Sequence, residues 1–122
     1  KIDVFTDKKI YSTLSKDYKN FKNIYYHFET KENIIKSSDC IMTDVFNSMN
    51  DKENKENILN KYQVNSEIMS MTNDNTVFMH CLPAKIGSEV TKEVIKGSKS
   101  IVLKQAANRL VAQRGILKWL NI

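Results

Sequence analysis

The sequence contains no apolar run that approaches the ~20 residues of a membrane-spanning helix, and it carries no recognisable secretory signal peptide. It also has no internal repeat and no low-complexity tract. Its 122 residues, 41% hydrophobic and 27% charged, are typical of one globular domain built around one core. Lys1 stands where a methionine would begin a gene product and leads directly into a strand-like run, so we expect a piece of a longer protein.

Residue types that build metal and redox sites are scarce. There are two cysteines, Cys40 and Cys81, and two histidines, His27 and His80, and none of the four has CxxC or HExxH spacing. The sequence therefore predicts no metal site. Both cysteines border apolar strand-like runs, so we expect free thiols in a reducing, cytoplasmic compartment rather than a disulfide.

Glycine is equally scarce, and the three glycines, Gly87, Gly97 and Gly115, lie far apart, which excludes a glycine-rich phosphate loop. The net charge of +5 permits a polyanionic partner. However, lysines alternate with acids, as in residues 51–56, and this pattern is more typical of a solvated face than of a nucleic-acid-binding patch. We expect neither nucleic acid nor membrane as a partner.

Short apolar runs alternate with helical patterns along the chain. The predicted strands cover residues 1–6, 23–28, 40–46, 76–79 and 100–103. The predicted helices cover residues 12–21, 30–35 with Thr30 as the cap, a charged stretch ending at 61, a segment capped by Asn65, residues 90–95 before Gly97, and residues 105–120. This alternation predicts an α/β fold with a mostly parallel sheet and helices on its faces. The last helix should carry its apolar side on Leu110, Ile116, Leu117, Trp119 and Leu120.

Polar and reactive side chains follow three of the predicted strands. Asp44 and Ser48 end the third, His80 and Cys81 follow residues 76–79, and Arg109 follows the last strand at the start of a helix. Ligands of an open parallel sheet bind outside the carboxyl ends of its strands. Each residue alone has an ordinary explanation, such as turn formation or core packing. Their shared location favours a binding site.

The residue types favour a transferase pocket over nucleophilic catalysis. Neighbours on an extended chain point to opposite faces, so His80 is poorly placed to deprotonate Cys81. Arg109 at a helix start can hold a phosphate or a polarised carbonyl group. His80 can donate a hydrogen bond to a carbonyl oxygen that gains charge in the transition state. Asp44 and Ser48 can hold an ammonium group.

Five segments of the chain resemble the ornithine carbamoyltransferases, within the aspartate/ornithine carbamoyltransferase family. The most specific is His80-Cys81-Leu82-Pro83, with a DxxxSM pattern upstream and an Asn-Arg pair downstream. The segments, in the order and spacing of the family, are residues 43–49, 62–65, 78–84, 87–91 and 105–109. The resemblance is specific from about Cys40 to the end and rests only on the element pattern before it.

The family transfers a carbamoyl group from carbamoyl phosphate to the δ-amine of L-ornithine, giving L-citrulline and phosphate. The resemblance implies direct attack by the amine, with no cofactor and no metal. It implies that residues 1–104 form most of a Rossmann-like ornithine-binding domain, incomplete at its N-terminus. Residues 105–122 would be a C-terminal helix that packs on a carbamoyl-phosphate domain absent from this sequence. The full-length enzyme would be a homotrimer or a multiple of trimers in arginine metabolism, and this chain alone would be inactive.

The resemblance also implies which residues bind ornithine. Asp44, Ser48 and Met49 would hold its amino-acid end, Met49 through its backbone. Two positions depart from the family pattern. Asn50 replaces a glycine, which would alter the flexibility of the loop, and Ala107 replaces an acid, which would loosen the surroundings of the neighbouring arginine.

Carbamoyl phosphate would bind to His80, Cys81, Leu82 and Arg109. Cys81 and the Leu82 backbone would line the junction where the δ-amine meets the carbamoyl carbon, while His80 and Arg109 would bind the carbonyl oxygen or the phosphate. The resemblance implies catalytic roles for His80, Cys81 and Arg109, and a cis peptide bond between Leu82 and Pro83.

Three alternatives remain open at this point. A related carbamoyltransferase could use putrescine or acetylornithine, although Asp44 with Ser48 and Met49 favours an α-amino acid. The chain could instead be a non-catalytic ligand-binding remnant of the family. A basic nucleic-acid-binding module is a more distant possibility.

Overall fold

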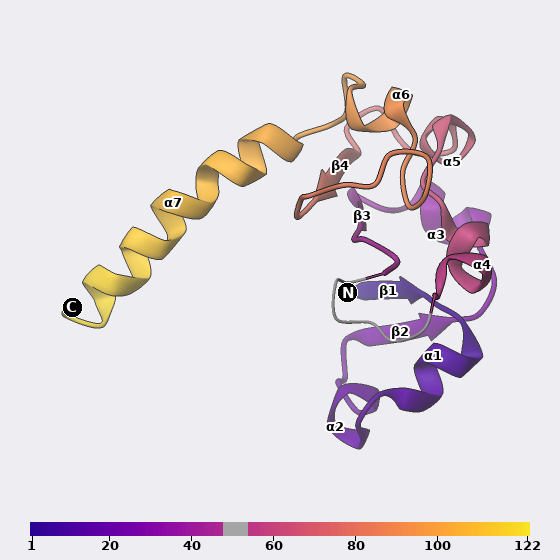
Figure 1. The fold of residues 1–122 in the computed structure, drawn as a ribbon, viewed down its shortest axis with the longest axis horizontal. Helices are drawn as coiled ribbons and strands as arrows, with labels where there is room; N and C mark the ends of the chain where they lie inside the picture. The colour runs from indigo at the N-terminus through magenta and orange to yellow at the C-terminus, as the bar shows by residue number, and fades with distance from the viewer. Residues whose placement is uncertain (48–53) are drawn as a thin grey trace.

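The computed structural model describes residues 1–47 and 54–122, and its strands are paired in parallel (Figure 1). The strands are β1 (Ile2–Phe5), β2 (Ile24–His27), β3 (Cys40–Thr43) and β4 (Val77–His80). The helices are α1 (Lys8–Thr13), α2 (Lys16–Lys19), α3 (Glu32–Lys36), α4 (Glu56–Leu59), the 3-10 helix η1 (Asn60–Tyr62), α5 (Ser66–Ser70), α6 (Lys92–Ile95) and α7 (Val102–Trp119). The predicted α/β class with parallel strands is confirmed. The described strands form two two-stranded sheets, β1–β2 and β3–β4, rather than one.

The first sheet is held by cross-strand and aromatic contacts. Phe5 lies opposite His27 in the register of β1 and β2, and their rings are 5.4 Å apart. Tyr11 of α1 packs against Tyr26 and Phe28, with ring centroids 4.9 and 5.4 Å away. These contacts place α1 on one face of the sheet, where the Tyr11 ring packs against it.

The second sheet carries the hydrophobic core. Phe78 of β4 is fully buried, and the cluster around it consists of Val64, Met69, Val90, Val94 and Val102. These residues come from α5, α6, the start of α7 and the segments before α5 and α6. Alternate residues of β4 are buried, as expected for a strand with one face toward a core.

The prediction of a last strand over residues 100–103 is wrong. Only Ser100 pairs with β4, opposite Phe78. The Phe78 N–H donates to the Lys99 carbonyl (2.8 Å) and the Ile101 N–H donates to the Phe78 carbonyl (3.0 Å). The Gln105 N–H then donates to the Ile101 carbonyl (2.8 Å), which closes a helical turn. The apolar residues after Ser100 therefore begin α7 at Val102, earlier than the predicted start at 105.

The helix predicted over residues 12–21 is also wrong in its bounds. The Asp7 carboxylate accepts a hydrogen bond from the Lys9 N–H (2.8 Å) and caps α1, so the helix starts at Lys8. Leu14 has extended backbone angles, which separate α1 from α2. Local capping therefore outweighed the apolar spacing from which the longer helix was predicted.

Single side chains determine two further boundaries, the start of α5 and the end of β3, but not the start of α3. Asn65 accepts a hydrogen bond from the Ile68 N–H (3.0 Å), which confirms its predicted role as the cap of α5. Thr30 does not cap α3, because Lys31 occupies that position without a side-chain hydrogen bond. The predicted strand over residues 40–46 ends at Thr43, because the Asp44 carboxylate accepts the Val45 N–H (2.7 Å) and forms a local turn.

Helix α7 projects away from the rest of the chain (Figure 1). Val102 at its start is its one buried residue, whereas Leu110 is 63% exposed and Trp119 80% exposed. The expected exposure of its apolar side in the isolated chain is confirmed, and the packing expected of Trp119 is not observed.

Within residues 1–47 and 54–122, no helix has both the length and the apolar composition that a membrane span requires.

The Tyr62 hydroxyl, from the 3-10 helix η1, contacts the ends of the first sheet. It lies 2.7 Å from the Thr6 carbonyl oxygen and 2.8 Å from the Phe28 carbonyl oxygen, at the ends of β1 and β2. We expect Tyr62→Phe to lower the free energy of unfolding by about 1–2 kcal/mol, because it leaves these part-buried acceptors without their donor. Urea denaturation measures the difference. Tyr25→Phe, at a ring 47% exposed, is the matched control and should change little. Equal effects of the two variants would contradict the assignment.

Asp3 and His27 form a part-buried pair in the first sheet, with His27 Nε2 2.8 Å from Asp3 Oδ1. The hydrogen bond from His27 lowers the pKa of the Asp3 carboxyl group below its ordinary value of 3.8. Its contribution to stability is therefore present above that ordinary value and is lost as pH falls through the lower folded-state pKa. We expect Asp3→Asn to lower the melting temperature at neutral pH by a few degrees. The difference from the wild type should vanish at the acid end of a pH series, and a difference that grows with acidification would contradict this account.

Candidate functional site

Asp44 and Cys81 meet at one edge of the second sheet. Thr43 and His80 are paired residues of β3 and β4, and Asp44 and Cys81 each follow this pair. The Cys81 thiol donates a hydrogen bond to Asp44 Oδ1 across 2.9 Å, and both side chains are exposed. The predicted convergence of these two strand ends is therefore confirmed, because parallel strands in register end at the same edge.

Asp44 also determines the charge state of the thiol. The hydrogen bond to the Asp44 carboxylate raises the pKa of Cys81, with burial as the next cause, while the Arg109 guanidinium opposes the rise as the smallest contribution. The thiol is thus a neutral hydrogen-bond donor at neutral pH rather than a thiolate. This agrees with a binding role and disfavours nucleophilic catalysis by Cys81.

His80 is buried, with 1% of its surface exposed. Its Nε2 atom lies 3.1 Å from Glu89 Oε1, and its Nδ1 atom accepts the Leu82 N–H at 2.9 Å. Both ring nitrogens are therefore engaged within the protein. That His80 donates to a substrate carbonyl or phosphate stays a prediction.

Glu89 was not among the residues singled out from the sequence. It is fully buried, and its Oε1 atom accepts both the His80 ring hydrogen and the Lys85 N–H, the latter at 2.6 Å. One signal was available, since Glu89 stands beside Val90 in a region that contains few acids. A solvated acid explains that pattern equally well, so the sequence alone could not identify the contact.

Residues 82–85, which follow Cys81, form an irregular turn that bends at Leu82. The Leu82–Pro83 peptide bond is cis, as predicted, and Leu82 has a positive φ of 55°. The turn directs the backbone of Leu82 inward, where its N–H meets His80. The side chain of Cys81 is left at the exposed edge of the sheet.

Helix α7 joins this edge through Gln105, whose side-chain oxygen accepts the His80 N–H at 3.1 Å. The prediction that Arg109 stands at the start of a helix is wrong, because α7 begins at Val102 and Arg109 lies further along it. Arg109 is exposed, as is Ala107. The charge of the Arg109 guanidinium slightly lowers the pKa of Cys81. The predicted binders Ser48 and Met49, and the departure at Asn50, lie outside the described residues.

Asp44, His80 and Cys81 together offer three potential metal-ligating atoms within 4.8 Å of one another. The donor set does not fit a metal ion. The Nδ1 lone pair of His80 accepts the Leu82 N–H, and its Nε2 faces Glu89. Cys81 and Asp44 are likewise bonded to each other, so an ion would have to break the 2.9 Å contact between the thiol and Asp44 Oδ1. The sequence spacing had missed this cluster because only the pairing of β3 and β4 assembles it.

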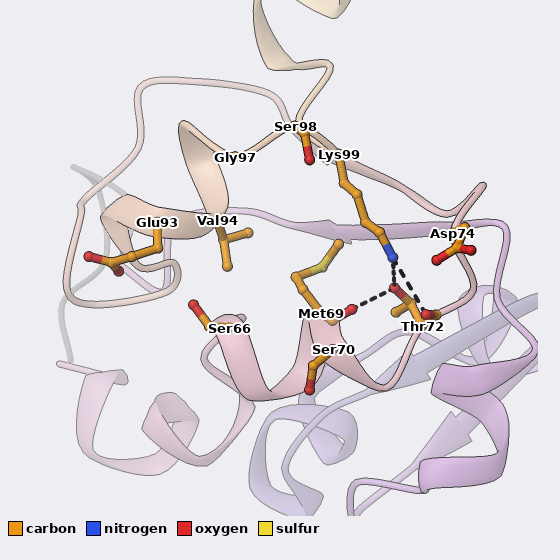
Figure 2. A pocket seen from close by; sticks show the side chains of 10 residues that line it. All are labelled: Ser66, Met69, Ser70, Thr72, Asp74, Glu93, Val94, Gly97, Ser98 and Lys99. Atoms are coloured by element: carbon orange, nitrogen blue, oxygen red, sulfur yellow. Dashed lines mark hydrogen bonds between the residues drawn. The ribbon is translucent and has the colours of Figure 1, made fainter.

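A separate groove of about 380 Å³ lies between α5 and α6 (Figure 2). Its lining consists of Ser66, Met69, Ser70, Thr72, Asp74, Glu93, Val94, Gly97, Ser98 and Lys99. The Lys99 amine donates to the Thr72 hydroxyl (2.9 Å), which itself donates to the Met69 carbonyl (2.7 Å). These polar groups bond to one another, and no predicted site residue lines the groove. The edge formed by Asp44 and Cys81 is therefore the better candidate site.

Comparison with protein families gives a match over residues 2–120. The matching family model is described as the aspartate/ornithine carbamoyltransferase, Asp/Orn binding domain. An ornithine carbamoyltransferase of Rhodopseudomonas palustris is 50% identical over 90 residues, which cover 72% of this chain and 29% of the relative. That of Hyperthermus butylicus is 46% identical over 86 residues, covering 68% and 27%. The matched part of the chain thus spans less than a third of the length of these relatives.

Solved structures give the same result for the fold. An anabolic ornithine carbamoyltransferase from Campylobacter jejuni has a TM-score of 0.83 and 26% identity, covering 98% of this chain and 43% of the other. One from Thermus thermophilus has a TM-score of 0.79 and 28% identity, covering 96% and 38%. The similarity extends beyond the segments that carry the sequence resemblance and includes most of the first sheet.

Proposed function

Because the chain belongs to the aspartate/ornithine carbamoyltransferase family, we propose that it is the ornithine-binding part of an ornithine carbamoyltransferase. The reaction would transfer the carbamoyl group of carbamoyl phosphate to the δ-amine of L-ornithine, giving L-citrulline and phosphate. Relatives with this name at about 50% identity support the proposal. Residues 1–104 would form most of the ornithine domain, and residues 105–122 would pack on a carbamoyl-phosphate domain supplied by the rest of the protein.

The observation that carries the proposal is the 2.9 Å contact between the Cys81 thiol and Asp44 Oδ1. A carboxylate exposed at a strand end attracts an ammonium group through a charge-assisted hydrogen bond. The carboxylate therefore favours a substrate that presents an α-ammonium group, as ornithine does. Ser48 and the Met49 backbone would complete the contacts to the amino-acid end.

The proposed reaction needs positioning and charge stabilisation. The neutral δ-amine attacks the carbamoyl carbon, a carbon–nitrogen bond forms, and the bond to the phosphate oxygen breaks. The amine gives up a proton to the departing phosphate, and phosphate leaves. Cys81 and the Leu82 backbone would line the junction of the two substrates, and Arg109 would bind the carbonyl oxygen or the phosphate. His80 would join Arg109 only by exchanging the Nε2–H contact with Glu89 for one with the substrate. No cofactor or metal is required.

Three further properties belong to the proposal. The full-length protein would form a homotrimer or a multiple of trimers, it would act in arginine metabolism, and it would be cytoplasmic. The location is supported by Cys40 and Cys81, which are both free thiols in the described part of the chain and suit a reducing compartment.

Calorimetry with a bisubstrate analogue, ornithine joined to a phosphonate, tests the proposal on the purified chain. We expect weak binding that Cys81→Ala abolishes and that Asp74→Ala, a remote acid of the groove, leaves unchanged. Analogues built on putrescine or acetylornithine should bind less well. Circular dichroism on the same samples checks folding, so that absence of binding by a folded chain would contradict the site.

The chain alone should form little or no citrulline, and turnover near that of a complete enzyme would refute the need for a second domain.

A further inference from the structure

Glu89 is a buried carboxylate that the proposed reaction does not use. Its side chain has no exposed surface, and Oε1 accepts the His80 Nε2–H (3.1 Å) and the Lys85 N–H (2.6 Å). Its second oxygen, Oε2, has no hydrogen-bond partner among the described residues. Burying a carboxylate is costly unless its hydrogen bonds repay the loss of water. This residue therefore needs a role that a hydrophobic side chain could not fill.

The contact with Glu89 decides which nitrogen of His80 carries the ring hydrogen. A neutral imidazole has one donor and one acceptor nitrogen. With the hydrogen on Nε2, facing the carboxylate, Nδ1 is free to accept the Leu82 N–H at 2.9 Å. The other tautomer would set two N–H groups against each other at Nδ1. It would also set two acceptors against each other at Nε2.

The same carboxylate closes the turn that begins at Leu82. Leu82 has φ 55°, a conformation that leucine seldom adopts, and its N–H is held by His80. Lys85, at the far end of the turn, donates its N–H directly to Glu89. One carboxylate thus fixes both ends of the turn, through His80 at one end and directly at the other. The turn follows Cys81, whose thiol must reach Asp44.

We propose that Glu89 is a positioning residue that selects the Nε2–H tautomer of His80 and thereby holds the turn that places Cys81 against Asp44. The inference rests on the proposed function at one point, the role of the contact between Cys81 and Asp44 in ornithine binding. The alternative is that Glu89 merely fills space near the core. The two explanations differ in whether the carboxylate oxygen, rather than the buried volume, is required.

The test uses the full chain with Cys40→Ser, which leaves Cys81 as its one cysteine. Variants Glu89→Ala and Glu89→Gln are compared with Ile35→Val, which removes a buried methyl group from α3 outside the turn. The first readout is the His80 tautomer from nitrogen-15 NMR of the ring. The second is the rate at which Cys81 reacts with an aromatic disulfide reagent.

We expect the Nε2–H tautomer in the parent chain and in Glu89→Gln, whose amide oxygen can still accept both hydrogen bonds. In Glu89→Ala the tautomer preference should be lost, and Cys81 should react several-fold faster because its contact with Asp44 is broken. Ile35→Val should change neither readout, although it lowers the melting temperature. An Nδ1–H tautomer in the parent chain would overturn the proposal, even if Glu89→Ala failed to fold. Unchanged tautomer and thiol rate in a folded Glu89→Ala would also overturn it.

The bisubstrate analogue separates this inference from the proposed function. Neither the tautomer nor the thiol rate involves a substrate, so both readouts test Glu89 even where the analogue does not bind. Where it binds, Glu89→Ala should weaken its affinity several-fold and Glu89→Gln should restore it. Equal weakening by both variants would contradict positioning through the carboxylate oxygen.

Discussion

Asp44→Ala is expected to weaken binding of the bisubstrate analogue by about tenfold to a hundredfold. A hydrogen bond to a charged group contributes about 1.5–3 kcal/mol, and each 1.4 kcal/mol changes an equilibrium constant tenfold. The Asp44 carboxylate is a charged group at the carboxyl edge of β3 and β4, and its Oδ1 already accepts the Cys81 thiol. Calorimetric titration of the wild type and the variant, at equal concentration and ionic strength, measures the ratio of affinities.

Asp44→Asn is the matched control, because it keeps an acceptor oxygen and removes only the charge. Its affinity should lie between those of the wild type and Asp44→Ala. Both variants should also lower the pKa of Cys81, since the hydrogen bond to the carboxylate is the first cause of its rise. Thiolate absorbance should then appear at lower pH than in the wild type. Analogue affinity equal to that of the wild type in Asp44→Ala would exclude this carboxylate from the ornithine site.

Phe78→Ala is expected to abolish cooperative folding. Phe78 has no exposed surface and is the largest side chain of the core cluster. Removing a buried phenylalanine costs about 3–5 kcal/mol through lost burial and the cavity that remains. Domains are commonly stable by only about 5–15 kcal/mol. A chain whose strands, within residues 1–47 and 54–122, form two separate two-stranded sheets has little reserve against such a loss.

Urea denaturation followed by far-ultraviolet circular dichroism measures this effect. Phe21→Ala is the control, because its ring is 53% exposed and its removal should change the free energy of unfolding by less than about 0.5 kcal/mol. A cooperative transition of Phe78→Ala at the wild-type midpoint would mean that β4 is not the centre of the core.

Local sequence patterns were sufficient for several features of the fold and the site. The β-branched and aromatic run before His80 predicted β4, and Asn65 predicted the start of α5. The position of Asp44 at the end of one predicted strand and of Cys81 after another predicted their meeting at one edge. Each of these depends on residues adjacent in sequence, on capping by one side chain, or on the general rule that parallel strands end together.

Element boundaries were less predictable wherever a nearby hydrogen bond competed with the apolar pattern. The apolar residues after Ser100 were compatible with a strand, yet the Gln105 N–H bonds to Ile101 and the helix begins at Val102. The cap formed by Asp7 likewise starts α1 at Lys8, before the predicted start at residue 12. In each case two local conformations suited the same residues, and the hydrogen bonds available in the folded chain chose between them.

The sequence by itself therefore determined the α/β class, the parallel pairing and the strand-end location of Asp44 and Cys81, because these follow from short-range periodicity. Only the tertiary structure decided that His80 is buried and that Glu89 is its partner. The Val64 N–H bonds to the Glu89 carbonyl at 2.9 Å, and this long-range contact helps to bring Glu89 beside the end of β4. Which acid reaches a histidine ring depends on how separate segments pack, and no local pattern encodes that choice.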